Sequence, residues 1–199
     1  MKTSSAVLGA VIMSALAACS AGSARTVVPA GVAAGTTAWT THGRFAAPTA
    51  ALPLPDLRTY QPELVPVGAE ITLVTKRSGA GASLTVTLAG VIPNRLYTAH
   101  VHTGACGADP SGSGPHYQEE KDSHQPSVDP AFANPANEVW LDLVTDGDGR
   151  GTATVTTAWF FRKGEANSLV LHAAKTHTEP GMAGKAGARI ACVTEQFGR

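Results

Sequence analysis

Five of the seven histidines stand where they could bind a transition metal: His100, His102, His116, His124 and His172. Neutral imidazole is a common protein ligand of copper and zinc. His100 and His102 are separated by one residue, and side chains two positions apart in a β-strand point to the same face. The pair would then act as a bidentate clamp. The alternative interpretation is two solvent-exposed histidines on a half-buried strand.

The other three histidines come from separate parts of the chain. His116 lies in the sequence Gly114-Pro115-His116-Tyr117, and His124 follows eight residues later. His172 ends the apolar run Leu169-Val170-Leu171, where a histidine is more often a packed core residue than a ligand. As one of a set of histidines, however, His172 becomes a candidate ligand.

The elements that must position these side chains are β-strands. The 21 Gly and 13 Pro, together with many Thr and Val, favour an all-β chain. Apolar residues alternate with threonine at 71–74 and 84–88 around a Gly-rich turn, which predicts a hairpin. Further strands are expected at 96–102, 139–145, 152–157, 169–173 and 189–193. Residues 103–137 and 175–188 lack a regular pattern, and loops longer than about 15 residues are usually functional.

The charge of the chain argues against a nucleic-acid partner. Fifteen Lys and Arg residues balance 15 Asp and Glu residues, and the basic residues form no cluster. Proteins that bind DNA or RNA usually present clustered basic groups to the phosphates. We therefore expect no nucleic-acid partner.

Residues 1–18 predict a secretory signal peptide. Lys2 precedes an apolar run that ends at Ala18, and at about 13 residues this run is too short to span a bilayer. The sequence Leu16-Ala17-Ala18-Cys19 resembles a bacterial lipobox, in which the cysteine is acylated. We expect an exported protein held at the outer face of the bacterial cell membrane only by a lipid on Cys19. The alternative is an ordinary signal peptide whose cleavage discards Cys19.

The rest of the chain divides into a linker and a domain. Residues 19–62 are rich in Ala, Gly, Thr, Ser and Pro without a sustained period, so we expect a lipid-anchored flexible linker there and a domain at 63–199. If Cys19 carries lipid, Cys106 and Cys192 remain. An even pair of cysteines in an exported chain predicts a disulfide.

Over roughly residues 63–198 the sequence resembles the copper/zinc superoxide dismutase family. The resemblance is carried by His100-Val101-His102, Cys106, Gly114-Pro115-His116, His124, Leu169-Val170-Leu171-His172-Ala173 and Ala186-Gly187-Ala188-Arg189-Ile190-Ala191-Cys192. It implies an eight-stranded antiparallel Greek-key β-barrel with two long functional loops. By position it also implies a disulfide between Cys106 and Cys192.

The resemblance also implies a metal site and an activity. His100, His102, His116 and His172 match the copper ligands, and His116 also matches the imidazole that is shared with zinc. Arg189 matches the arginine that attracts superoxide beside the copper, and His116 matches the proton donor. The implied reaction is copper-dependent dismutation of superoxide to dioxygen and hydrogen peroxide at the cell surface. The alternative is a copper-binding surface lipoprotein, a buffer or scavenger, with the same fold and little turnover.

The sequence departs from the family pattern at the zinc site. His116 and His124 match zinc ligands, but Ala133 and Ala136 stand where a further His and an Asp are expected. Thr176 replaces the aspartate that links the two metal sites in the family. We therefore expect copper with weak or absent zinc, as in a copper-only or zinc-depleted branch. The residues that could substitute in a zinc site are Asp122, Asp129, Glu138 and Asp142, with Asp129 and Glu138 the first candidates.

Overall fold

The computed structural model describes residues 35–199 apart from residues 50, 52–55 and 80. These residues form nine strands and one short 3₁₀ helix: β1 (Thr37–Arg44), β2 (Leu57–Thr59), β3 (Glu70–Ser78), β4 (Gly81–Ala89), β5 (Leu96–His102), η1 (Pro110–Ser113), β6 (Trp140–Val144), β7 (Gly151–Thr156), β8 (Ser168–His172) and β9 (Arg189–Thr194). In this part of the chain no helix is long and apolar enough to cross a membrane. The predicted signal peptide and Cys19 lie outside the described residues.

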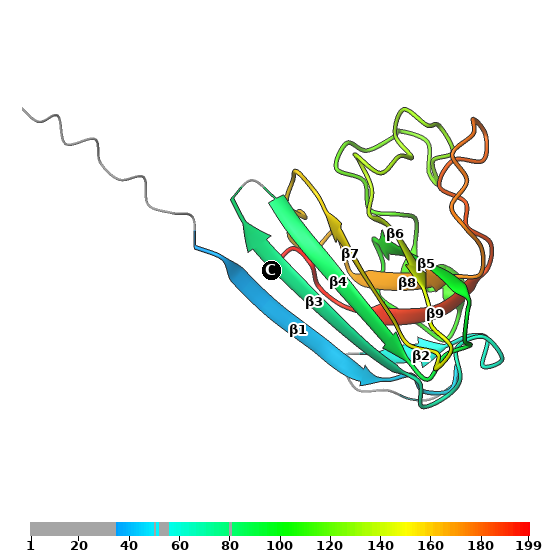
Figure 1. Ribbon diagram of the computed structural model, residues 1–199. Coiled ribbons are helices and arrows are strands. Elements are labelled where there is room, and N and C mark those ends of the chain that lie inside the picture. The colour runs from blue at the N-terminus through cyan, green and yellow to red at the C-terminus, as the bar shows by residue number, and fades with distance from the viewer. Residues whose placement is uncertain (1–34, 50, 52–55, 80) are drawn as a thin grey trace, which may run out of the picture. The chain divides into compact units, whose positions relative to one another are not determined.

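The strands form two antiparallel sheets that face each other (Figure 1). One sheet has the order β1-β3-β4-β7 and the other the order β2-β9-β8-β5-β6. All of the strands expected from the period-two pattern are present. The all-β prediction is confirmed, but the described residues form nine strands in two sheets rather than a closed eight-stranded barrel.

The core lies between the two sheets, as the alternating sequence of the strands requires. In β4, Leu84, Val86 and Leu88 are completely buried, while the threonines between them are only partly buried. Tyr97, Ala99 and Val101 of β5 are each 1% exposed and join the same core. Side chains of a strand point alternately to its two faces, so the residues between these three must lie on the other face of β5.

Two strands, β1 and β2, lie inside the segment 19–62 that was predicted to be a flexible linker. The linker prediction is therefore wrong at these two strands. β1 pairs with β3 over its whole length, from Thr37 opposite Arg77 to Arg44 opposite Glu70. β2 pairs with β9. β1 has no apolar period because it is an edge strand with one buried residue, Thr41. Its backbone hydrogen bonds to β3 stabilise it instead.

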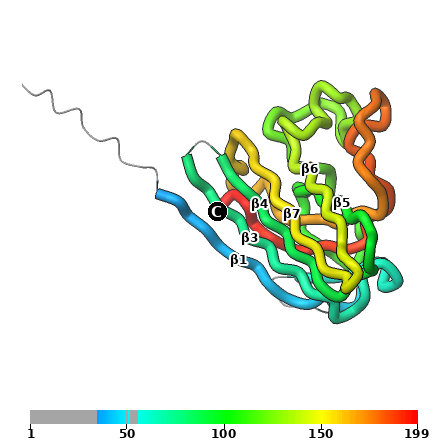
Figure 2. The backbone as a smooth tube through the Cα atoms, viewed as in Figure 1, coloured from blue at the N-terminus to red at the C-terminus, as the bar shows by residue number. Residues whose placement is uncertain are grey.

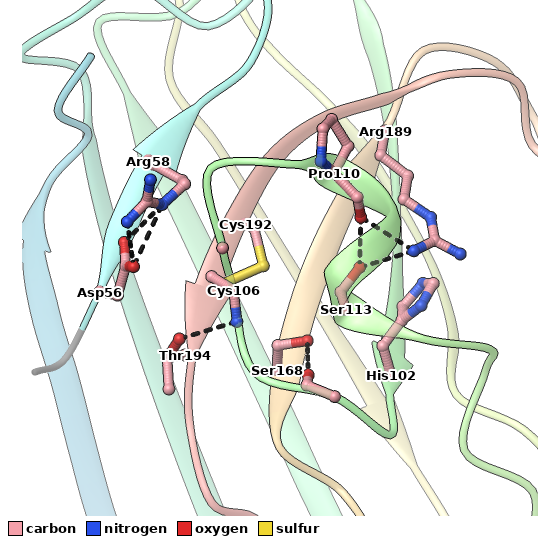
Figure 3. Close-up of a disulfide and its surroundings, with 12 residues drawn as sticks. Asp56, Arg58, His102, Cys106, Pro110, Ser113, Ser168, Arg189, Cys192 and Thr194 are labelled. Atoms are coloured by element: carbon pink, nitrogen blue, oxygen red, sulfur yellow. Dashed lines mark hydrogen bonds and ion pairs between the residues drawn. A yellow bond between two sulfur atoms is a disulfide. The ribbon is translucent and has the colours of Figure 1, made fainter. Parts of the chain in front are cut away.

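The two long loops predicted at 103–137 and 175–188 are present and lie at the same end of the sheets, as the tube in Figure 2 shows in green and orange. The first loop is tied to β9 by the predicted disulfide, Cys106–Cys192, which is confirmed. Next to it, the backbone N–H of Cys106 donates to Thr194 Oγ1 at 3.0 Å (Figure 3). The covalent bond therefore joins the loop to β9, which lies between β2 and β8 in the second sheet.

Candidate metal centre

Four of the five candidate histidines converge on one point. β5 contributes His100 and His102, the first long loop contributes His116, and the end of β8 contributes His172. One ring nitrogen of each lies within 4.8 Å of the others. The ring centroids of His100 and His116 are 4.1 Å apart, and those of His102 and His172 are 5.4 Å apart. This is the arrangement expected of a metal site built from imidazoles.

Three of the four rings are buried and His116 is partly buried, although all four lie outside the sandwich core. His100 and His102 point away from the core, as predicted, but both are completely buried. His172 is 4% exposed, and the side chain of His116 is 16% exposed. The two long loops cover this face of the second sheet, so the alternative of exposed surface histidines is excluded.

Each ring has one nitrogen bound to a polar partner. The pairs are His102 Nδ1 with the carbonyl of Gly114 (2.9 Å), His116 Nδ1 with Glu138 Oε2 (2.7 Å), His172 Nδ1 with the carbonyl of Gly187 (3.5 Å) and His100 Nε2 with Thr176 Oγ1 (2.8 Å). A carbonyl only accepts hydrogen bonds, so Nδ1 carries the proton in His102 and His172. Their Nε2 atoms then hold lone pairs. Such partners fix the tautomer and orientation of metal-binding histidines.

The second nitrogen of each ring, which has no such partner, is available to bind a metal ion. His100 Nδ1 is buried and has no hydrogen-bond partner among the described residues. His102 Nε2 and His172 Nε2 face each other at 3.2 Å. Two lone pairs at this distance repel unless a cation lies between them, and a buried unpaired nitrogen costs free energy. A bound metal would remove both costs.

Burial keeps these imidazoles neutral. Desolvation, with a smaller contribution from neighbouring His116, lowers the pKa of His100 and of His102 well below the ordinary value. The same two causes lower the pKa of His172 to about 3. Only the neutral ring has a lone pair for a metal, so these rings are ready to bind one at neutral pH.

Glu138 holds His116 in place. This carboxylate is 2% exposed and accepts hydrogen bonds from His116 Nδ1, from Gln118 Nε2 at 2.8 Å and from Trp140 Nε1 at 2.7 Å. From the sequence, Glu138 was expected only as a substitute zinc ligand, and its contact with His116 was not predicted. Glu138 lies 22 residues from His116 and belongs to no motif, so only the fold of the loop brings them together.

The structure does not bring His124 into the cluster. The His124 side chain is 94% exposed, and its Nδ1 lies 3.1 Å from Ser123 Oγ and 3.7 Å from Asp122 Oδ1. On the other side of the predicted second metal site, His116 Nδ1 is occupied by Glu138. The described residues therefore do not assemble a second metal site from His116 and His124.

Arg189 lies beside the histidines and is anchored to the first loop. Its Nη1 donates to the carbonyl of Pro110 at 2.9 Å and to Ser113 Oγ at 2.7 Å (Figure 3). Its Nη2 donates to the carbonyl of Gly114 at 2.7 Å. Burial lowers the pKa of Arg189 from its ordinary value. A guanidinium releases its proton only far above neutral pH, so Arg189 still carries a positive charge at neutral pH.

A pocket of about 440 Å³ connects the histidines to solvent. Its lining includes His116, His172 and Arg189, together with Lys185 and Met182 from the second loop. A small anion that entered it would meet fixed positive charge next to the imidazole cluster. The described residues thus define a class of protein: a disulfide-bonded β-sandwich with a cluster of four histidines that could hold a metal ion, at the end of a pocket lined by Arg189 and Lys185.

Comparisons with known proteins place this chain in a family. The sequence profile of copper/zinc superoxide dismutase (SODC) matches residues 67–194, and the chain belongs to that family. The predicted membership of the copper/zinc superoxide dismutase family is thereby confirmed. No curated protein sequence matches the chain.

One of two similar solved structures agrees with the family at the level of the fold. The Cu/Zn superoxide dismutase from Brucella abortus has 22% sequence identity and a TM-score of 0.50, and the match covers 80% of this chain and 99% of that one. A double mutant of a superoxide-dismutase-like protein from Bacillus subtilis has 18% identity and a TM-score of 0.48, and its match covers 62% of this chain and 87% of that one.

Proposed function

We propose that this protein is an exported superoxide dismutase that uses copper, without zinc, at the tetrahistidine site. The observation that carries the proposal is the set of four converging imidazoles, each with one nitrogen held by a protein partner, at the end of a pocket lined by Arg189. The expected substrate is the superoxide anion. The products are dioxygen and hydrogen peroxide.

Copper is the metal that suits both the ligands and the reaction. Imidazole ligands suit copper and zinc alike, but zinc has no redox chemistry. When bound, copper supplies the one-electron exchange with superoxide. The described residues offer His100 Nδ1 and the Nε2 atoms of His102, His116 and His172 for this ion.

Two residues of the chain complete the chemistry. Arg189 attracts the anion into the pocket and orients it by hydrogen bonding, and its anchoring to the loop fixes the position of the charge. His116 would donate a proton to the departing peroxide from Nε2 once that atom is no longer bound to the metal and has taken up a proton, while Glu138 keeps a proton at Nδ1. Glu138 is therefore a positioning residue rather than a catalytic one.

The proposal excludes zinc from a catalytic or structural role. Glu138 takes the Nδ1 atom through which His116 would bind a second metal, and His124 is exposed to solvent.

We also propose export and attachment through a lipid on Cys19, which the lipobox-like sequence supports.

One purified sample tests the function. Elemental analysis of protein purified with both metals present is combined with an assay of superoxide consumption. We expect about one copper and little zinc per chain, with superoxide consumed faster than by the metal-free protein. Stoichiometric zinc would contradict the copper-only part. A copper-loaded protein that does not consume superoxide would instead support the alternative of a copper-binding protein without turnover.

A further inference from the structure

Met182 places a thioether in the same pocket as the imidazoles. It is 37% exposed and lines the pocket together with His116 and Arg189. In the part of the chain that the structure describes, the other two sulfur atoms form the disulfide. Met182 therefore carries the sulfur that is available to an oxidant entering this pocket.

The loop holds this side chain at a defined place. The backbone N–H of Met182 donates to the carbonyl of Glu179, and the N–H of Lys185 donates to the carbonyl of Met182, both at 3.0 Å. The Lys185 side chain then returns to the sulfur, with Nζ donating to Met182 Sδ at 3.5 Å. Lys185 also lines the pocket, so an ammonium group and a thioether share one position at its wall.

We propose that Met182 is an oxidation site of this pocket, where hydrogen peroxide converts the thioether to methionine sulfoxide with assistance from Lys185. Methionine sulfoxide is a common product of exposure to peroxide and is reversible by reductases. The inference rests on the proposed function for the local source of peroxide. The reactivity of Met182 itself does not depend on that function.

The reaction balances with peroxide as the only oxidant. A sulfur lone pair attacks one peroxide oxygen, the S–O bond forms and the O–O bond breaks. Sulfur loses two electrons, and the other oxygen leaves as water after the proton of the attacked oxygen is transferred to it. The Lys185 ammonium can hydrogen-bond to the leaving oxygen and afterwards to the sulfoxide oxygen, which stabilises charge in the transition state.

The first experiment uses added hydrogen peroxide and metal-free protein. A matched reference is Val67→Met, because Val67 is 57% exposed and does not line the pocket. Peptide mass spectrometry follows sulfoxide formation at both positions in one molecule. Although Met182 is less exposed, we expect it to oxidise about threefold faster or more, and Lys185→Gln to remove this advantage. Equal rates at the two positions, or no effect of Lys185→Gln, would overturn the assistance by Lys185.

The second experiment tests the local source of peroxide. Copper-loaded Val67→Met protein is supplied with superoxide in the presence of catalase, which removes peroxide from bulk solution. We expect sulfoxide at Met182 and little at position 67, while equal oxidation at both positions would overturn a source inside the pocket. Superoxide consumption is recorded in the same sample. If it is absent, the proposed function fails, and the first experiment alone decides the reactivity of Met182.

Discussion

Arg189 and His102 donate hydrogen bonds to the same carbonyl oxygen, that of Gly114, at 2.7 Å and 2.9 Å. One backbone group thus orients both an imidazole of the candidate metal centre and the positive charge that would attract the substrate. Gly114 has φ of 71°, in the left-handed region that favours glycine. The position of the carbonyl therefore depends on a residue without a side chain.

Gly114→Ala should displace the Gly114 carbonyl and so weaken its orientation of both His102 and Arg189. A Cβ atom at Gly114 would lie 2.6 Å from Thr103 Oγ1, and the left-handed backbone alone costs about 1 kcal/mol or more for alanine. We expect a lower free energy of unfolding and weaker copper binding, measured by denaturant titration and by competition with a chelator. Gly112→Ala is the control, because its Cβ would meet no atom within 4 Å. Similar behaviour of the two variants would contradict the prediction.

Removing the disulfide should loosen the same loop. The Cys106–Cys192 bond closes a long loop, with a sequence separation of 86, and connects the segment carrying Gly114 to β9. The double variant Cys106→Ser, Cys192→Ser should be less stable by about 2–5 kcal/mol, because the unfolded chain gains freedom. Copper affinity should fall with it. Unchanged unfolding midpoints for the variant and the oxidised wild type would refute this expectation.

The strands were predictable where one face of a sheet is buried, because burial imposes alternation. β4 alternates leucine or valine with threonine and was identified in the sequence. β1 was missed because backbone pairing stabilises it, together with the hydrogen bond from Trp39 Nε1 to Glu195 Oε1 at 3.1 Å. That contact spans 156 residues of sequence and leaves no local pattern.

The candidate site, like the fold, was predictable in part: its four histidines were predicted from the sequence, but the hydrogen-bond partners of their rings were not. The spacing of His100 and His102 indicates a shared face, and the resemblance assigned the candidates His116 and His172 to the same site, where the structure brings them together. The partners of these rings were harder to predict. The carboxylate on His116 comes from a loop whose path depends on tertiary packing, and the carbonyl groups of Gly114 and Gly187 belong to backbone that any sequence has.

Glu138→Gln should weaken copper binding. Glutamine has one acceptor oxygen and one NH₂ group in place of two acceptor oxygens, so it cannot satisfy the donors of His116, Gln118 and Trp140 together. Loss of such a partner typically reduces metal affinity or activity by about 10–100-fold. Competition with a copper chelator measures the effect. Glu120→Gln is the matched control, because Glu120 is exposed. If both variants bind copper like the wild type, Glu138 does not position His116.

Cys19→Ser should release the protein from the membrane fraction or leave it unprocessed. Stable anchoring requires more than one acyl chain, which lipidation of this cysteine would provide. Fractionation of cells and the mass of the mature N-terminus measure the outcome. A substituted protein that is processed normally and stays on the membrane would show that the lipobox interpretation is wrong.

Arg189→Ala should separate catalysis from copper binding. A guanidinium is not a metal ligand at neutral pH, and His102 keeps its bond to Gly114, so copper content should change little. Turnover should fall and lose much of its dependence on ionic strength, because salt screens steering by a fixed charge beyond about 10 Å at 0.1 M. His102→Ala, in contrast, should lower copper content and turnover together.

A second substitution distinguishes the charge of Arg189 from its contacts with the loop. Arg189→Lys keeps the positive charge, but one ammonium group cannot reproduce the planar fork that reaches Ser113 and Gly114. If the charge attracts superoxide, this variant should retain the salt dependence that Arg189→Ala loses, whatever its absolute rate. Stopped-flow measurement of superoxide decay over a range of salt concentrations gives the absolute rate and its dependence on salt. A fully copper-loaded wild type that consumes superoxide no faster than Arg189→Ala would contradict a dismutase, because a protein that only binds copper has no anion turnover for Arg189 to accelerate.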